Sequence, residues 1–489
     1  MEELSNKSCY LRLKEVLVHD EELFLIDKSG CFTQKEALEI YYGYLNQLES
    51  FIKDGSVCLI APFARKETAL IIAAVISLGG IVIMGDPKMT RHTFIDQINN
   101  VVSINTLISY KEESWRIKCN DQWSNINTVR EQLKVSPLLK ARKDKPSFYF
   151  LTSGSTGDNK IVALSEYSFL NHLYRQKSDA GRPDGTSYFC LPLHHIFGCG
   201  VLLQALITAQ KIFISDTRNY SFALEMIEKY RCTSIANVPT FFYMLIEENM
   251  KNPHDISSLQ FGVMAGGAYS AEQFSSVENI LGIALCSSYG MTEASTVITN
   301  SPTFKPFEER RVGVGKPFPD VNVIFKDNDG FINDKEGEIC FKGYNLMLGY
   351  VTKEGLDLPV DEDGYFHTGD VGMIDEMGII HIVGRKKNII IRGGENLSPS
   401  LIEQKIMALP NIKDACVVGL PDEKYGEVVA AYIVRDGDIS EEDIRNLLMS
   451  NLLKREMPEI ILVDDSVPLL SSGKHDYQTV KKLLKKIKG

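Results

Sequence analysis

The sequence lacks paired cysteines and a long unbroken apolar run. Its ten cysteines include no C-x-x-C pair, and the two nearest in sequence are Cys190 and Cys199. A disulfide framework or a zinc ribbon is therefore not expected, and reduced thiols in a cytosol fit better. The longest apolar stretch, residues 69–84, is short for a membrane span and is interrupted by Gly79-Gly80. We expect a buried helix, a Gly-Gly turn and a buried strand there, in a soluble cytoplasmic protein.

Targeting signals and an excess of basic charge are also missing. The N-terminal MEELSNKSCY lacks the basic-then-apolar order of a signal peptide, and the C-terminal KIKG is not a peroxisomal S-K-L. The formal net charge of −11 and pI near 5.5 argue against general nucleic-acid binding. The lysine-rich segment 481–488 is therefore predicted to be a solvated helix end rather than a nucleic-acid arm.

A chain of 489 residues with 44% hydrophobic content is expected to form two or three globular domains. Strand and helix patterns alternate to about residue 300, which favours α/β architecture with doubly wound parallel sheets. Examples are strands at 56–60, 80–84, 211–214 and 234–238, and helices at 67–78, 222–229 and 240–250. Short runs at 321–326, 337–342 and 379–383, with Asp-Gly turns, predict a small β subdomain. A compact α+β segment of roughly 100 residues follows.

The segment from Thr152 to Lys160 is rich in small and hydroxyl residues and follows the β-prone run 148–151. Glycine backbone N–H groups, hydroxyls and an ammonium group in one loop can bind a phosphate chain. The common P-loop does not fit, because Gly154 and Gly157 lie too close together and no Ser or Thr follows Lys160. Taken alone, the loop is equally consistent with a flexible surface turn.

Two glycine-containing segments follow predicted strands further along the chain. Ser288-Tyr289-Gly290-Met291-Thr292-Glu293 offers a flat ring for a purine, a phosphate donor in Thr292 and a hard magnesium ligand in Glu293. Its alternative interpretation is a turn into a helix N-terminus, where the dipole favours glutamate. Ala265-Gly266-Gly267-Ala268 permits close approach of a planar base, or is simply a tight strand-to-helix turn.

Later segments add an acid, a basic cluster and a lysine. Asp370 in Thr368-Gly369-Asp370 can accept both hydroxyls of a ribose, although a hairpin turn explains the pattern equally well. Gly384-Arg385-Lys386-Lys387 lies where the composition changes, which makes a domain hinge plausible; a basic cluster is more usually a solvated face. Lys474 ends a glycine-containing loop; taken alone, this pattern is better explained by an exposed surface lysine. His194-His195 lies in an apolar context without partners at metal-ligand spacing.

In order and approximate spacing, the segments from 152 to 474 resemble the adenylate-forming superfamily of acyl-CoA synthetases, adenylation domains and luciferases. The resemblance implies domains at 1–384 and 388–489, joined by a hinge at 385–387, with a mobile C-terminal domain. It also implies ATP, Mg²⁺ and coenzyme A as cofactors, and a small carboxylic acid as substrate. No nucleic acid and no membrane span are expected.

The resemblance implies a role for each matching residue. The ATP phosphates would be wrapped by Thr152, Ser153, Gly154, Ser155, Thr156, Gly157 and Lys160. The rest of the nucleotide would lie against Gly266, Gly267, Ala268, Ser288, Tyr289 and Gly290, with its ribose on Asp370 and Arg385. Thr292 would contact the α-phosphate, Glu293 would ligate magnesium, Lys387 would be the hinge, Lys474 the catalytic lysine, and His195 would lie beside the acyl pocket.

The sequence departs from the family pattern at three places. Asp158-Asn159 precedes Lys160 where a proline usually precedes the lysine, and Leu470 and Tyr477 replace a common Thr and Arg around Lys474. Amino-acid-activating members carry an aspartate near the apolar-pocket motif, where this chain has His194-His195. A fatty or aryl acid is therefore the expected substrate.

Three alternatives remain at this stage. Because the chain ends soon after Lys474 without a fused carrier segment, free coenzyme A is the expected acceptor and a separate phosphopantetheinylated carrier protein is the alternative. A non-catalytic adenylate-binding relative is disfavoured, because Glu293, Asp370 and Lys474 are all present. A P-loop kinase is disfavoured by the absent Walker spacing.

Overall fold

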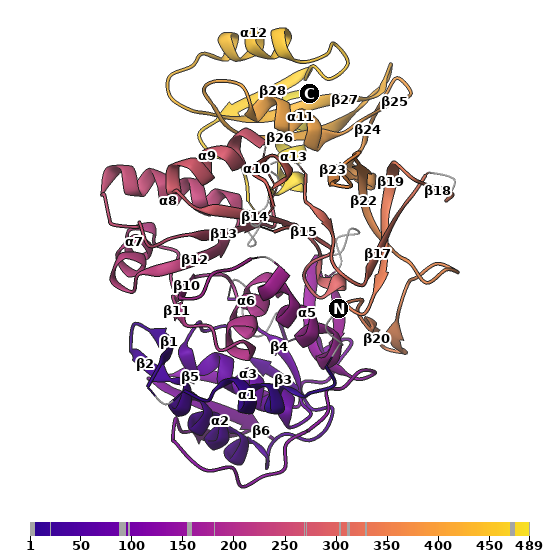
Figure 1. Ribbon diagram of the computed structural model, residues 1–489. Helices are drawn as coiled ribbons and strands as arrows, with labels where there is room; N and C mark the ends of the chain where they lie inside the picture. The colour runs from indigo at the N-terminus through magenta and orange to yellow at the C-terminus, as the bar shows by residue number, and fades with distance from the viewer. Residues whose placement is uncertain are drawn as a thin grey trace.

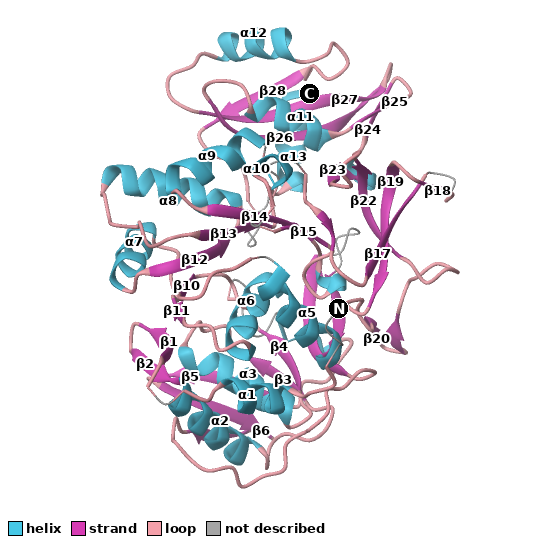
Figure 2. Cartoon of the chain, in the orientation of Figure 1, coloured by secondary structure: helices cyan, strands magenta, loops and turns pink. Residues whose placement is uncertain are grey.

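The computed structural model describes residues 5–19, 21–87, 94–95, 98–153, 159–179, 181–267, 269, 271–302, 305–310, 313–327, 330–469 and 475–488. Four β-sheets and the helices around them make up this part of the chain (Figures 1 and 2). The predicted α/β class is confirmed, with two large nine-stranded sheets and two small five-stranded sheets.

The two large sheets have nine strands each and are mixed rather than purely parallel. In the first, β14-β13-β12-β10-β11-β1 run parallel, and β2, β15 and β16 are antiparallel edge strands. Its spatial order is β16 (Lys316–Pro317), β15 (Thr299–Ser301), β14 (Ala284–Tyr289), β13 (Phe261–Ala265), β12 (Cys232–Asn237), β10 (Thr186–Phe189), β11 (Ile212–Ile214), β1 (Leu23–Asp27) and β2 (Gly30–Thr33).

The second large sheet has a parallel centre, β8-β4-β3-β5, flanked by antiparallel hairpins. Its order is β21 (Gly355–Asp357), β20 (Gly349–Thr352), β9 (Asn159–Ser165), β8 (Pro146–Ser153), β4 (Ile81–Met84), β3 (Val57–Ile60), β5 (Thr106–Lys111), β6 (Ser114–Cys119) and β7 (Gln122–Ile126). The antiparallel pairs were not predicted, because hairpin partners of buried strands carry the same apolar pattern as parallel strands.

Along the chain, one small sheet precedes and the other follows a short 3₁₀ helix, η2 (Lys386–Asn388). The first is the predicted β subdomain, antiparallel in the order β18 (Ile332–Asn333), β17 (Val321–Lys326), β19 (Glu336–Gly343), β22 (Phe366–Ile374) and β23 (Ile380–Arg385). The second comprises β25 (Glu395–Leu397), β24 (Ile390–Arg392), β27 (Gly426–Arg435) and β26 (Ile412–Asp422), with β28 (Ile460–Asp464) parallel to β27. The chain therefore changes sheets within the predicted hinge region.

The helices follow the predicted apolar periodicity closely. The predicted helices 67–78, 222–229 and 240–250 are α3 (Lys66–Ser77), α7 (Tyr220–Lys229) and α8 (Pro239–Lys251). The others are α1 (Cys9–Val16), α2 (Gln34–Leu48), α5 (Glu166–Asp179), α6 (Ile196–Ile207), α9 (Ala271–Leu281), α10 (Phe307–Arg310), α11 (Pro399–Met407), α12 (Glu441–Asn451), α13 (Tyr477–Lys488) and the 3₁₀ helix η1 (Thr292–Ala294). Within the described ranges, no helix is both long and apolar enough to cross a bilayer.

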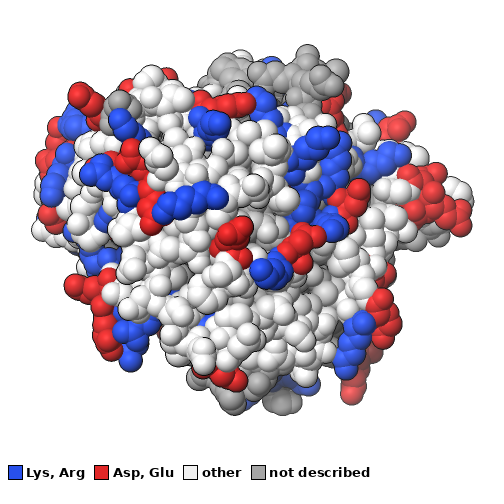
Figure 3. Space-filling model, turned by 90° about the horizontal axis from the view of Figure 1, so that it is seen from below, with Lys and Arg blue, Asp and Glu red and all other residues white. Residues whose placement is uncertain are grey.

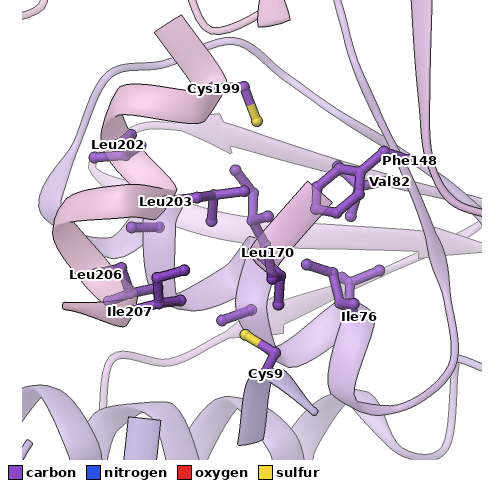
Figure 4. Packing of buried hydrophobic residues seen from close by; sticks show 14 of the residues in the cluster. Cys9, Ile76, Val82, Phe148, Leu170, Cys199, Leu202, Leu203, Leu206 and Ile207 are labelled. Carbon is purple, nitrogen blue, oxygen red and sulfur yellow. The ribbon is translucent and has the colours of Figure 1, made fainter. Parts of the chain in front are cut away.

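The main core lies between the two large sheets and is centred on α6. Ten of the twelve residues of α6 are buried, which is typical of a helix enclosed on all sides. Figure 4 shows Leu203, Leu206 and Ile207 of this helix facing Leu170 of α5 and Ile76 of α3. Since α6 begins at the His194-His195 motif, this packing fixes the position of that motif.

A separate core supports the C-terminal sheet. Strands β26 and β27 pack against α11 and α12, with Ile402, Ile433 and Leu448 fully or almost fully buried. The exposed ion pair of Lys413 with Glu247, at 2.7 Å, links this domain to α8. In Figure 1 the C-terminal domain lies above α8, α9 and the β subdomain.

The surface charge is mixed in sign. On the face shown in Figure 3, Lys and Arg side chains lie close to Asp and Glu side chains around a broad uncharged area. Such a mixture agrees with the net charge of −11 and gives this face no continuous attraction for a polyanion.

A buried ion pair near the start of α3 gives a test of this fold. Lys66 Nζ lies 3.0 Å from Asp27 Oδ1, and both side chains are almost fully buried. Burial acts to raise the pKa of the Asp27 carboxyl, but hydrogen bonds from Ser29 and Lys66 outweigh it and hold that pKa below its usual value. Lys66→Met should lower the free energy of unfolding at pH 7 by about 3–5 kcal/mol, because it leaves a buried unpaired carboxylate.

Chemical denaturation as a function of pH measures this effect. Because the folded-state pKa of Asp27 is depressed, the stabilisation is present above the unfolded pKa of about 4 and is lost as the pH falls below it. The difference between wild type and variant should therefore shrink in acid. Lys28→Met is the matched control, since Lys28 pairs with Asp216 at 2.7 Å on the surface, and should cost less than about 1 kcal/mol. Equal losses in the two variants would contradict the burial argument.

Candidate functional site

One large cavity, of about 830 Å³, brings together most of the segments predicted from the sequence. Residues from the carboxyl ends of β13 and β14, from the β8–β9 hairpin, from β22 and β23 and from the start of α6 line it. Ligands of open α/β sheets bind at the carboxyl ends of parallel strands, where loops converge. The cavity therefore lies where this fold is expected to have its site.

The turn after β14 is held in a tight conformation at the cavity wall. Ser288, Gly290, Thr292 and Glu293 all line the cavity. A Cβ atom on Gly290 would lie 1.8 Å from the backbone oxygen of Thr296, so only glycine fits this close approach. The Glu293 side chain is buried and accepts a hydrogen bond from Tyr350 Oη at 2.8 Å. Among the described residues, no hydrogen bond joins its other carboxylate oxygen, which can therefore serve as a ligand for a cation.

Asp370 joins β14 to the β subdomain through two hydrogen-bonded partners. Tyr289 Oη donates to Asp370 Oδ2 at 2.7 Å, and Arg385 Nε lies 2.6 Å from Asp370 Oδ1. Burial raises the pKa of the Tyr289 hydroxyl, and the Asp370 charge adds to that rise. Ser288 and Gly290 line the cavity, whereas Tyr289 between them is not among the lining residues.

The predicted phosphate loop connects two antiparallel strands. Ser153 at the end of β8 pairs with Asn159 at the start of β9, so the two described ends of the segment lie side by side on antiparallel strands. Thr152 and Lys160, at its two ends, line the cavity, and Lys160 Nζ lies 4.3 Å from the Tyr350 ring centroid. Gly154, Ser155, Thr156 and Gly157 lie outside the described residues.

The Gly-Gly turn after β13 borders the same cavity. Gly266 lines it and has a φ of +80°, which a residue with a side chain adopts with strain. A Cβ atom on Gly267 would lie 3.1 Å from the Pro239 ring, so this turn packs closely against α8. Ala268 lies outside the described residues.

His195 is the N-cap residue of α6. It lines the cavity together with Gly198, where a Cβ atom would lie 2.1 Å from the backbone oxygen of Pro192. Its ring packs on His194, with 4.1 Å between the centroids. The helix start thus requires glycine and presents an imidazole to the cavity.

The cavity is cationic although the chain is acidic. Its lining includes two glutamates, Glu293 and Glu338, and six basic residues: Lys160, Arg182, Arg218, Arg385, Lys386 and Lys387. Burial lowers the pKa of the Lys387 ammonium, and the nearby Arg385 charge lowers it further. A surplus of positive charge in a concave site suits a polyanionic ligand.

Sequence reasoning missed several residues at this site, among them Glu338, Tyr350 and His367. Glu338 Oε2 lies 3.0 Å from Lys386 Nζ and 3.2 Å from His367 Nδ1, and Tyr350 contacts Glu293 as described above. Glu338 and Tyr350 lie in β strands with no motif around them, so no sequence signal marks them. His367 lies beside Thr368-Gly369-Asp370 and could have been included with that segment.

Lys474 lies outside the described residues, but the chain on both sides of its loop is described. Leu469 and His475 form an antiparallel bridge, and His475 Nε2 lies 3.0 Å from Asp414 Oδ2. Tyr477, which replaces the usual arginine, donates a hydrogen bond to Glu403 at 3.2 Å. Gly393 and Gly394 form the exposed turn between β24 and β25 and do not border the cavity.

Comparison with known proteins identifies matches along most of the chain. A family model described as AMP-binding enzyme matches residues 46–351, and one described as AMP-binding enzyme C-terminal domain matches residues 401–474. Acyl-CoA ligase sidI from Aspergillus fumigatus is 34% identical over 66% of this chain and 58% of its own length. A 2-succinylbenzoate–CoA ligase from Staphylococcus aureus is 34% identical over 71% of this chain and 72% of its own length. The chain thus matches less than two thirds of the length of sidI.

Solved structures share the fold at low sequence identity. ATP-bound MatB from Rhodopseudomonas palustris has a TM-score of 0.85 and 22% identity, and covers 99% of this chain and 100% of its own. MenE from Bacillus subtilis, solved with the acyl-adenylate intermediate OSB-AMP, has a TM-score of 0.81 and 22% identity, and covers 97% of this chain and 98% of its own. The predicted resemblance to adenylate-forming enzymes is confirmed at the level of the family and the fold.

The close approach at Gly290 gives a test of the cavity wall. Gly290→Ala should weaken binding of AMP at least about tenfold, because the Cβ atom would push the turn at Ser288–Glu293 away from Thr296. Isothermal titration calorimetry measures the change. Gly85→Ala is the control, since its nearest new contact would be an ordinary 3.4 Å to the Pro62 ring. Unchanged AMP binding by a folded Gly290→Ala protein would contradict the assigned wall.

Proposed function

Because the chain belongs to the family of AMP-binding enzymes, we propose that it is an ATP-dependent carboxylic acid:CoA ligase that releases AMP. The observation that supports this most is the joint presence of the Ser288–Glu293 turn, Gly369, Arg385 and His195 around one cationic cavity. The family relatives named acyl-CoA ligase and 2-succinylbenzoate–CoA ligase support the same reaction class.

In the proposed first half-reaction, the acid carboxylate attacks the α-phosphorus of ATP and displaces pyrophosphate. Both reactants are anionic, so positive groups must reduce their repulsion and stabilise the charge that grows on the phosphate. Thr292 would donate to the α-phosphate, and Thr152, Lys160 and the loop between them, from Ser153 through Gly157, would hold the departing β- and γ-phosphates. The Asp370 carboxylate, which is held in place by Tyr289 and Arg385, would accept the ribose hydroxyls.

A magnesium ion fits the lining of the cavity at Glu293. Its carboxylate is buried, engages Tyr350 through one oxygen and offers the other as a hard ligand, and phosphate oxygens would complete the coordination. Bound magnesium would neutralise phosphate charge and orient the leaving group. Lys160, close to Tyr350, would add a second positive group on the same side.

The proposed second half-reaction requires the C-terminal domain, residues 388–489, to rotate against residues 1–384. Lys387 in η2 would be the hinge, because the chain passes there from one sheet to another. Lys474 would serve adenylation and then withdraw, and the turn at Gly393-Gly394 would approach the cavity to line a thiol tunnel. The exposure of that turn is consistent with a state that precedes this rotation.

Free coenzyme A is the proposed thiol, with a phosphopantetheinylated carrier protein as the alternative acceptor. The thiol would attack the acyl carbonyl of the adenylate and expel AMP. A cytoplasmic location fits both acceptors and stays a prediction.

The proposed acid is a fatty or aryl carboxylic acid. Both lining glutamates lie near the nucleotide residues, and Glu293 and Glu338 are engaged with Tyr350 and Lys386. An amino-acid substrate would need a carboxylate to pair its α-ammonium group, and the described wall near His195 offers none. Apolar residues of α6 and β13, such as Val201 and Val263, are also part of the lining.

Product analysis with a panel of acids tests the proposed reaction. With ATP, magnesium and coenzyme A, the protein should form AMP and pyrophosphate rather than ADP, and only with non-amino acids. Pyrophosphate exchange separates the first half-reaction from the second. ADP as product, or strong exchange with an L-amino acid, would contradict the proposal.

Lys474→Ala tests whether this lysine serves adenylation but not thioester formation. It should lower the rate of adenylation at least about a hundredfold, the usual cost of removing one donor from a transition state. Thioester formation from a supplied acyl-adenylate should remain close to wild type. Lys485→Ala removes the same charge from α13 and should leave both steps unchanged. Equal loss of both steps in Lys474→Ala would refute the two-state scheme.

A further inference from the structure

Arg182 carries a charge inside the cavity that no described carboxylate neutralises. It lies in the turn between α5 and β10 and lines the same cavity as the residues described above. Its Nη1 makes one long hydrogen bond, 3.4 Å, to Gln210 Oε1, and its Nε is buried and finds no acceptor in the described part of the chain. Its guanidinium lies over the Phe261 ring, 5.6 Å from the centroid. Neither of these neighbours offsets a full positive charge.

The surroundings of Arg182 contain further unsatisfied donors. Gln210 is almost fully buried, and its Nε2 has no hydrogen-bond partner among the described residues. Burial lowers the pKa of the Arg182 guanidinium to about 10, and the nearby Cys286 thiol acts slightly in the opposite direction. The guanidinium therefore stays charged at neutral pH. A buried charge of this kind is costly unless a partner supplies the opposite charge.

The position of Arg182 relative to the reacting groups follows from strand β13. Phe261, Val263 and Ala265 alternate along this strand and so point to one face of the sheet. Ala265 and the adjacent Gly266 border the nucleotide end of the cavity, whereas Phe261, at the other end of the strand, lies under Arg182. Phe261 and Ala265 are four residue steps apart along the strand, which corresponds to roughly 13 Å.

The wall between these two ends is apolar. Ala236 pairs with Val263, and Val263 pairs with Cys286, so the three side chains form one row across β12, β13 and β14. All three line the cavity, and Val201 of α6 lines it as well. An elongated ligand would thus pass from the nucleotide end along an apolar surface to a guanidinium.

We propose that Arg182 binds a second carboxylate at the far end of the acid substrate, so that the substrate class is a dicarboxylic acid. The inference rests on the proposed ligase function and narrows it. One carboxylate is activated at the nucleotide end, the apolar part of the acid lies along β13, and the other carboxylate pairs with Arg182. The fork of N–H donors on a guanidinium matches a carboxylate in shape as well as charge.

Matched pairs of acids test this assignment in the unaltered protein. Each pair has the same length, one member ending in a methyl group and the other in a carboxylate, in a linear and an aryl series. With pyrophosphate exchange as the readout, kcat/KM for the best dicarboxylic acid should exceed that of its matched monocarboxylic acid by at least about tenfold. A preference for monocarboxylic acids, or equal rates at every length, would overturn the assignment and leave the ligase function intact. Absence of exchange with every acid would refute both.

Substitution of Arg182 assigns the preference to this residue. Arg182→Met should lower kcat/KM for the dicarboxylic acid about tenfold to a hundredfold, while the matched monocarboxylic acid keeps or gains activity. Arg445→Met is the control, because Arg445 is a surface residue of α12 paired with Glu441, and it should leave both values unchanged. An unchanged ratio in Arg182→Met would overturn the assignment. If that variant does not fold, the substrate preference of the wild type decides the question.

Discussion

Asp370 holds together strands that belong to two different sheets, and the candidate site depends on this junction. Its carboxylate accepts from Tyr289, the last residue of β14, and pairs with Arg385, the last residue of β23. The three residues thereby fix the end of the first large sheet against the β subdomain. Immediately after Arg385 the chain enters η2 and then the C-terminal sheet. A ligand that contacts Asp370 would therefore touch a junction that ends at Arg385, directly before the chain enters η2.

The second constraint is electrostatic. The whole chain has a net charge of −11, yet the cavity of the candidate site is lined by six lysines and arginines and by two glutamates. Both glutamates are engaged by neighbours, Glu293 with Tyr350 and Glu338 with Lys386. The remaining positive charge is divided between the nucleotide end, at Lys160 and Arg385, and the far end at Arg182. This division is what suggests an elongated ligand with negative charge at both ends.

The sequence predicted the helices and the buried strands because their apolar periodicity is strong, as in α3, α7 and α8. It predicted the site segments because glycine and hydroxyl residues mark turns that side chains would block, as at Gly290 and Gly198. It did not predict the β8–β9 hairpin, because an apolar strand does not reveal the direction of its neighbour. Nor did it identify Glu338, Tyr350 or Arg182, since their importance comes from contacts across the fold and not from local sequence.

The most direct test of adenylation is to trace an oxygen atom of the acid carboxylate into the products. If the acid is supplied with its carboxylate labelled with oxygen-18, direct attack on the α-phosphorus of ATP transfers one labelled oxygen to AMP when the thioester forms. Mass spectrometry of the AMP from a single turnover should therefore find one labelled oxygen in each molecule. Label in inorganic phosphate, with ADP as the nucleotide product, would show attack on the γ-phosphorus instead and would contradict an adenylating enzyme.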